Sequence, residues 1–180
     1  MDLGSGSGTD AFVAAVAVAA SGAVTGVDMT DAQLEKARRL AERDGFSGVR
    51  FEKGYIENTP IETSSVDVVI SNGVINLCAD KASVFREIDR VLKPGGRMAI
   101  SDIVTEKPLT EAIVCDVNLW ASCIGGARQQ HDYQGDIEGA GLQVKELRDN
   151  PEYYFISDSA QGATETFGVK SVSVLAIKPN

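Results

Sequence analysis

The residues best suited to binding chemistry come at the start of the chain, in the stretch "DLGSGSG" from Asp2 to Gly8. Glycine occupies every second position there, so the backbone can turn tightly and approach a ligand closely. A segment with helical periodicity follows directly, and the amide groups at the start of a helix attract polar and anionic ligand atoms. We therefore expect a ligand to be held by Asp2, Gly4, Ser5, Gly6 and Gly8.

A second candidate is Asp28, twenty residues after Gly8 at the end of the predicted strand "AVTGVD". In open α/β sheets, a carboxylate at this place can accept hydrogen bonds from the hydroxyls of a ribose. The glycine loop and Asp28 together indicate a cofactor that contains adenosine.

The spacing of the glycines argues against a dinucleotide. In the fingerprint G-x-G-x-x-G/A the last position falls on Thr9 here, and the third glycine, Gly8, comes one residue early. The carboxylate of Asp2 would also add negative charge beside a pyrophosphate, whereas it suits a cationic sulfonium and an amino group. A nicotinamide oxidoreductase stays an alternative, which competition with NADH would reveal.

Side chains that could contact such a cofactor follow the next two predicted strands. After "VRFEKG" come Tyr55, Ile56 and Glu57, where an apolar side chain can stack on adenine and a carboxylate can accept from its exocyclic amine. After "VDVVIS" comes Asn72, whose amide can orient a substrate or the cofactor. The alternatives are that Ile56 is core, Glu57 is solvated and Asn72 forms a turn.

Alternating strands and helices must position these residues. Apolar runs predict strands at Ala23–Asp28, Val49–Gly54, Val66–Ser71 and Arg97–Val104, and helical periodicity predicts helices at Asp10–Ala20, Asp31–Asp44 and Lys81–Leu92. Thr30 and Gln33 have capping-box spacing at the second helix, and Pro94 ends the third. This alternation predicts a doubly wound α/β sheet of mainly parallel strands, which binds its ligands at the carboxyl ends of the strands.

The last part of the chain has weaker patterns. We expect a helical stretch at Leu109–Gly126, a strand near Leu142–Leu147 and a final, edge-type strand at Val169–Lys178. We find no repeat or linker, so residues 1–180 are expected to form a single domain.

The composition limits the class of partner. With 17 Lys+Arg against 26 Asp+Glu, the chain has a net charge of −9, which would repel nucleic acid and anionic membrane surfaces. We find no long apolar run or leader and expect a soluble, cytoplasmic protein with a small-molecule substrate. The three cysteines, Cys78, Cys115 and Cys123, lack CxxC spacing and are expected to be free thiols.

Five stretches, taken in order, resemble the Rossmann-like S-adenosylmethionine-dependent methyltransferases: "DLGSGSG", "GVDMT", "KGYIENTP", "VDVVISNGVINL" and "RVLKPGG". They cover roughly residues 1–104. The sequence is more similar still to the arsenite methyltransferases, because "LWASCIGGA" resembles their segment "LWxxCxGGA". This resemblance implies a Rossmann-like sheet with an antiparallel last strand, and S-adenosylmethionine as the methyl donor.

The resemblance also implies roles for single residues. It places Asp2, Gly4, Gly6 and Gly8 around the methionine part of the cofactor, and Asp28 beside the ribose. It places Met29, Ile56 and Glu57 near the adenine, and Asn72 and Val74 near the methyl group. Methyl transfer from a sulfonium is an in-line displacement that needs alignment and exclusion of water rather than an acid–base pair. A sequence with a single histidine outside any motif, His131, agrees with that.

Trivalent arsenic is thiophilic, so an arsenite substrate predicts thiol ligands. Cys123 matches the family segment, but Gly73 stands where the family has the cysteine of "SNCVINL", and a further family cysteine lies upstream of the glycine loop. Two sulfurs bonded to one atom lie within about 4 Å of each other. On one continuous helix, Cys115 and Cys123 would be about 12 Å apart. We therefore expect Cys78 with Cys123 as the arsenic ligands, and Cys123 and Asn72 as catalytic candidates; the alternative is that all three cysteines are buried hydrophobes.

Two classes of function stay open. The first is methyl transfer to a small soft nucleophile such as As(III), or to a different small molecule. The second is a catalytically weak or silent cofactor-binding fold, because Met1 directly precedes Asp2 and we expect an N-terminally truncated sheet with a more exposed cofactor. Homo-oligomerisation is compatible with the sequence where it would cover that exposed side.

Overall fold

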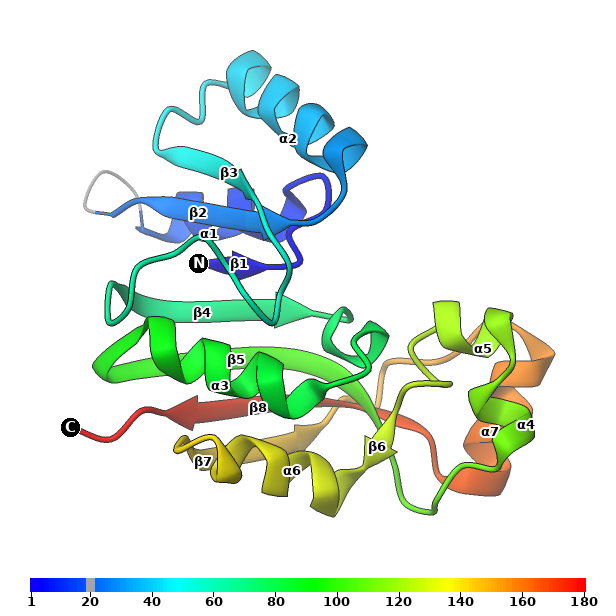
Figure 1. Cartoon of the computed structure of the whole chain (residues 1–180). Helices are drawn as coiled ribbons and strands as arrows, with labels where there is room; N and C mark the ends of the chain where they lie inside the picture. Colours follow the sequence, from blue (N-terminus) through cyan, green and yellow to red (C-terminus); the bar gives the residue numbers. More distant parts are fainter. Residues whose placement is uncertain (19–21) are drawn as a thin grey trace.

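One mixed sheet carries the fold (Figure 1). The structure is a computed structural model, and it describes residues 1–18 and 22–180. Within these residues the strands are β1 Asp2–Leu3, β2 Val24–Asp28, β3 Val49–Lys53, β4 Val66–Asn72, β5 Leu92–Thr105, β6 Arg128–Gln129, β7 Gln143–Asp149 and β8 Lys170–Ile177. Their order is β3-β2-β1-β4-β5-β8-β7, with β6 paired to β5. Neighbouring strands from β3 to β5 are parallel, and β8 is antiparallel to both β5 and β7, as expected for the last strand.

Helices lie on both faces of the sheet and beyond one of its edges. They are α1 Thr9–Val18, α2 Asp31–Asp44, α3 Lys81–Val91, α4 Glu111–Val114, α5 Val117–Ala121, α6 Gln130–Gly139 and α7 Asp158–Phe167, with a 3₁₀ turn, η2 Ile75–Leu77. In Figure 1, α3 and α6 cover the near face and α1 lies behind the sheet, whereas α4, α5 and α7 gather at the right, on the side toward which β1, β2 and β4 point. That place is the carboxyl edge of the parallel strands, where open α/β sheets bind ligands. No helix within the described ranges is long and apolar enough to cross a bilayer.

Three groups of buried side chains hold these layers together. The largest joins α3 and α6 to the sheet, and in it the rings of Phe85 and Tyr133 meet edge to face with centroids 5.3 Å apart. A second group packs α1 and α2 on β2 and β3 through residues such as Leu34 and Phe51. A third group, which includes Ile124, lies around the segments that follow β5. We call these groups the central, amino-terminal and carboxyl-edge cores.

The segment between β5 and β6 differs from the expectation. The helical stretch predicted at Leu109–Gly126 is confirmed only in part, because it holds two short helices, α4 and α5, and not one continuous helix. The carboxylate of Asp116 accepts hydrogen bonds from the amides of Asn118 and Leu119, so a new helix starts there. Cys123 lies beyond the end of α5, and the helical spacing between Cys115 and Cys123 therefore does not apply.

Three smaller expectations at element ends are also corrected. The last strand, β8, is not an edge strand, because β7 pairs with its outer side. The side chain of Thr30 makes no capping hydrogen bond, so the capping box with Gln33 is not formed. The first helix is described from Thr9 to Val18, and the predicted end at Ala20 lies outside the described residues.

A hollow of about 1120 Å³ lies between α1 and strands β4, β5 and β8. It is lined by side chains such as Val13, Ile70 and Leu175, on the face of the sheet behind α3 and α6. At the carboxyl edge the hollow reaches Asp10 and Asn72. It therefore opens onto the edge where the predicted ligand residues lie.

Candidate active site

The glycine loop connects β1 to α1 and folds back on β2. The amides of Gly4 and Ser5 donate to one carbonyl of β2, at 2.8 and 3.0 Å, and the amide of Gly6 donates to Asp28 Oδ2 at 2.9 Å. Gly4 has a φ of 75°, in the left-handed region, and a Cβ there would lie 2.5 Å from Cγ1 of Val74. Glycine is required at this position both by the backbone conformation and by the close approach of Val74 in the turn after β4.

Two polar atoms of this loop are buried without a hydrogen-bond partner in the described part of the chain. They are Oδ2 of Asp2 and Oγ of Ser5, and the residue Asp2 as a whole is 2% exposed. Burial raises the pKa of Asp2 to about 6, and the nearby carboxylates of Asp10 and Asp28 add to the rise. A buried polar group without a partner costs about 1–3 kcal/mol, and a cation relieves repulsion between carboxylates. The loop therefore suits a ligand that brings a positive charge and hydrogen-bond donors.

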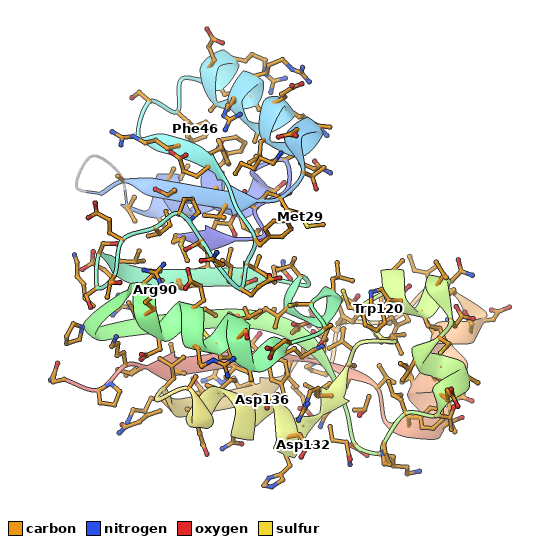
Figure 2. The ribbon with its side chains drawn as sticks, viewed as in Figure 1. Met29, Phe46, Arg90, Trp120, Asp132 and Asp136 are labelled. Carbon is orange, nitrogen blue, oxygen red and sulfur yellow. The ribbon has the colours of Figure 1, made fainter. Side chains whose placement is uncertain are left out.

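Asp28 ends β2 and fastens two loops to each other. Its Oδ2 accepts from Gly6, and its Oδ1 accepts from the amide of Thr30 at 2.8 Å. Each carboxylate oxygen has a second acceptor site, so Asp28 keeps capacity for ligand hydroxyls. The next residue, Met29, is 62% exposed and projects from this end of β2 (Figure 2).

The loop after β3 carries the expected Tyr55, Ile56 and Glu57. Tyr55 and Glu57 are exposed, whereas Ile56 is partly buried and packs against the central core. This burial agrees with the core role that the sequence left open for Ile56. The loop is fastened to α3 by Thr59, whose amide and hydroxyl donate to Glu87 Oε1 at 2.7 and 2.6 Å.

The turn after β4 meets the glycine loop. The Nδ2 atom of Asn72 lies 3.4 Å from Asp10 Oδ2, which links β4 to the start of α1. Gly73 follows with a φ of 65°, and Val74 packs against Gly4. The glycine loop and the turn after β4 are thus in contact, and the expected role of Asn72 and Val74 near the methyl group stays a prediction.

Cys123 brings a thiol to the same turn. Its Sγ donates to the carbonyl oxygen of Gly73 across 3.0 Å. Cys123 has a φ of 62°, which costs a residue with a Cβ about 1–2 kcal/mol and is a kind of strain concentrated at functional sites. Burial raises the pKa of Cys123 to about 11, the charge of Asp102 adds to the rise, and Lys81 opposes it. At neutral pH, Cys123 is therefore a protonated thiol.

The other cysteines occupy different surroundings. The thiol of Cys78 donates to the carbonyl of Asp80 at 3.6 Å and packs against the central core, whereas Cys123 packs against the carboxyl-edge core. Cys115 is exposed at the end of α4. Among residues 1–18 and 22–180, no three His, Cys, Asp or Glu side chains are grouped as a metal site. The expected pairing of Cys78 with Cys123 stays a prediction, and the thiol of Cys123 donates its hydrogen bond to the carbonyl of Gly73.

A buried polar cluster lies beneath this turn and was missed by the sequence reasoning. Asn76 of η2 is 0% exposed, and its Nδ2 donates to Asp102 Oδ1 at 2.8 Å and to the carbonyl of Ile103 at 2.6 Å. The hydroxyl of Tyr133 donates to Asp102 Oδ2 at 3.1 Å. Burial raises the pKa of Asp102 to about 6. The signal that could have found this cluster is a polar residue inside each of two apolar stretches, "VINL" and "ISDIV".

Comparison with known proteins agrees with this geometry. A family model described as "Methyltransferase domain" matches residues 1–141. The chain belongs to this methyltransferase domain family. It is 41% identical over 159 residues to an arsenite methyltransferase of Halobacterium salinarum, a match that covers 88% of this chain and 41% of that protein. It is 46% identical over 136 residues to the arsenite methyltransferase of Homo sapiens, covering 71% of this chain and 36% of that protein.

A solved structure has the same fold as this methyltransferase domain. An arsenic(III) S-adenosylmethionine methyltransferase from Chlamydomonas reinhardtii matches it with a TM-score of 0.80 at 35% identity, covering 99% of this chain and 62% of that chain. The expected Rossmann-like methyltransferase sheet is thereby confirmed. The chain spans about two fifths of the length of the curated relatives described above.

Proposed function

We propose that this methyltransferase domain uses S-adenosylmethionine to methylate a small soft nucleophile, with As(III) as the acceptor. The observation that carries the proposal is the thiol of Cys123, which donates to Gly73 at 3.0 Å. That turn also contacts the glycine loop through Val74 and Gly4. A thiophilic acceptor held by Cys123 would lie beside a donor held by the loop. The arsenite methyltransferases among the relatives support this acceptor.

The residues of the glycine loop fit the donor. The unpartnered Oδ2 of Asp2 and Oγ of Ser5 would receive the ammonium group, and Asp28 would accept hydrogen bonds from the ribose hydroxyls. When bound, S-adenosylmethionine supplies an activated methyl group on a sulfonium. The carboxylates of Asp2, Asp10 and Asp28 favour that positive charge. The chain's own contribution is to align the two reactants, not to transfer a proton between them.

The protonated state of Cys123 fits capture of arsenite. When the thiol exchanges with As(OH)₃, an S–As bond forms, an As–O bond breaks, and the thiol proton leaves with the hydroxide as water. No separate base is needed for this step. A donor held by Asp2, Ser5 and Asp28 would then supply its methyl group to the arsenic lone pair. An As–C bond would form as the S–C bond broke, and the positive charge would pass from the sulfonium to arsenic, which would go formally from As(III) to As(V).

We also infer that residues 1–180 act as a single domain. The family model ends at residue 141, but β8 lies beyond it and pairs along β5 from Arg97 to Val104. Side chains of β8 such as Val172 and Val174 belong to the central core. The residues beyond the match therefore support the same sheet.

Two measurements test the proposed function. Calorimetric titration should detect S-adenosylmethionine binding at or below millimolar concentration, and mass spectrometry should detect methylated arsenic and S-adenosylhomocysteine when arsenite is added. The variant Cys123→Ser should lose arsenite-dependent turnover while binding the donor as before, and the exposed Cys115→Ser is the matched control. No donor binding at millimolar concentration would refute the methyltransferase assignment. Donor binding without arsenite-dependent product would refute the acceptor, and tighter binding of NADH would favour an oxidoreductase.

A further inference from the structure

Asn76 is buried at a position where its amide orientation is fixed. Both partners of Nδ2, Asp102 Oδ1 and the carbonyl of Ile103, are acceptors, so the nitrogen must face them and Oδ1 must face away. Oδ1 of Asn76 is buried with no hydrogen-bond partner in the part of the chain that the structure describes. Such an atom costs about 1–3 kcal/mol, yet the side chain keeps this orientation. The two bonds to β5 therefore help to hold η2 in place, together with the burial of Ile75 in the central core.

The main chain of Asn76 contacts the segment that carries Cys123. A Cβ on Gly126 would lie 1.9 Å from the carbonyl oxygen of Asn76, so the two backbones are in direct contact. Gly126 comes three residues after Cys123, and Asn76 comes three residues after Gly73. A shift of Asn76 would therefore move the two partners of the Cys123–Gly73 hydrogen bond relative to each other.

Charged and polar groups on several elements surround this anchor. Asp102 of β5 also accepts from the amide of Ile103 at 2.9 Å and from Tyr133 of α6 at 3.1 Å. Lys81 of α3 is buried, donates to the carbonyl of Cys78 at 2.9 Å and acts on Asp102 through its charge. Asn76 thus donates to the carboxylate of Asp102, which also accepts hydrogen bonds from the main chain of β5 and from a side chain of α6.

We propose that Asn76 is a positioning residue: by anchoring η2 to β5, it keeps the thiol of Cys123 hydrogen-bonded to the carbonyl of Gly73. The thiol then stays capped until a soft acceptor displaces its proton. The inference rests on the proposed function for the identity of that acceptor, whereas the capped thiol itself can be tested without any methyl transfer.

The test is the rate at which iodoacetamide alkylates Cys123 in the native protein, measured by peptide mass spectrometry. The exposed Cys115 serves as the reference within each sample. In Asn76→Ala the rate ratio of Cys123 to Cys115 should rise about tenfold, because a capping hydrogen bond of ordinary strength is lost. The isosteric Tyr133→Phe, which removes one bond to Asp102, should raise the ratio about two- to threefold and guards against an unstable Asn76→Ala.

The matched control is Thr59→Val, which removes the buried hydrogen bond to Glu87 on another side of α3. Its ratio should stay within twofold of the unsubstituted chain. The proposal is overturned if neither Asn76→Ala nor Tyr133→Phe changes the ratio in folded protein. It is also overturned if Thr59→Val raises the ratio as much, since the effect would then be general loosening.

A second readout separates this inference from the proposed function. In Asn76→Ala, calorimetry should give S-adenosylmethionine an affinity within twofold of the unsubstituted chain, while the KM for arsenite rises about tenfold. Alkylation needs neither donor nor acceptor, so an unsubstituted chain that fails to methylate arsenite would refute the proposed function without affecting the alkylation result. An unchanged KM for arsenite together with an unchanged alkylation ratio would refute the positioning role of Asn76.

Discussion

Replacing Gly73 by cysteine should convert the single-thiol turn into a site with two thiols. The carbonyl of Gly73 lies 3.0 Å from the Sγ of Cys123, so the two residues already touch. A Cβ built at Gly73 meets no atom within 4 Å, and a new thiol therefore has room. Gly73→Cys should bind arsenite through one As–S bond more than the unsubstituted chain forms.

The magnitude follows from two separate effects. The backbone of Gly73 has a φ of 65°, so any residue with a Cβ there should destabilise the fold by about 1–2 kcal/mol. This strain is present with and without arsenite and does not reduce affinity. The second As–S bond forms within one molecule, and linked contacts of this kind raise affinity by about 10²- to 10⁴-fold. We expect arsenite to bind at least about 100-fold more tightly.

The assay is calorimetric titration of arsenite under reducing conditions that leave both thiols free. Gly73→Ser carries the same backbone strain and nearly the same volume without the soft ligand, and it is the matched control. In the double variant Gly73→Cys with Cys123→Ser, the gain should disappear. The reasoning is refuted if Gly73→Cys binds no more tightly than Gly73→Ser, or if the gain survives the loss of Cys123.

Three further predictions concern the residues around this turn. Gly4→Ala should lower the free energy of unfolding by about 2 kcal/mol or more, because the new methyl group would overlap Val74. Urea titration should show that the double variant with Val74→Ala recovers part of this free energy, and no recovery would contradict the close packing. The pKa values of Asp2 and Asp102 are both raised from 3.8 to about 6, so the folded state loses stability as pH rises between these values, by up to about 3 kcal/mol for each group. Asp2→Asn should make this slope clearly shallower, leaving the part that belongs to Asp102, in unfolding measured from pH 4 to 7, and an unchanged slope would count against the raised pKa of Asp2. Cys123→Gly should be more stable than Cys123→Ala by about 1 kcal/mol in thermal or urea unfolding, because glycine relieves the φ of 62°, and equal stability would argue against strain.

Most of the fold was predictable because its signals are local. The stripe of α3 from Val84 to Val91 is buried as its spacing predicts, and α2 ends at Gly45 with a φ of 75° where a left-handed residue is needed. The break between α4 and α5 was not predictable in this way. The residues of α4 and α5 form no long apolar face that would have marked the ends of each helix. The carboxylate of Asp116 starts α5 by accepting hydrogen bonds from the amides of Asn118 and Leu119.

The edge assignment of β8 failed for a different reason. Alternating polar and apolar residues such as those of Lys170–Ile177 are typical of a strand with one buried face, whether or not a neighbour pairs with its outer side. The pairing of β7 with β8 depends on backbone hydrogen bonds, which the side-chain pattern does not encode. The same holds for β6, a two-residue strand beside the end of β5.

The sequence by itself determined where the residues proposed to hold the methyl donor come together. The glycine loop follows β1, and Asp28 and Asn72 are the last residues of β2 and β4. The alternation of parallel strands with helices brings these strand ends to one edge of the sheet. Their order along the chain is therefore enough to place them together.

Only the tertiary structure decided the surroundings of Cys123, where we propose that the acceptor binds. The thiol of Cys123 meets the carbonyl of Gly73 across fifty residues of sequence, and Asn76 meets Asp102 and Gly126. No spacing relates these residues, because the chain between them breaks after α4 and turns through a positive φ at Cys123. Packing against the carboxyl-edge core fixes that path, and it is this packing that sets a single thiol beside the turn after β4.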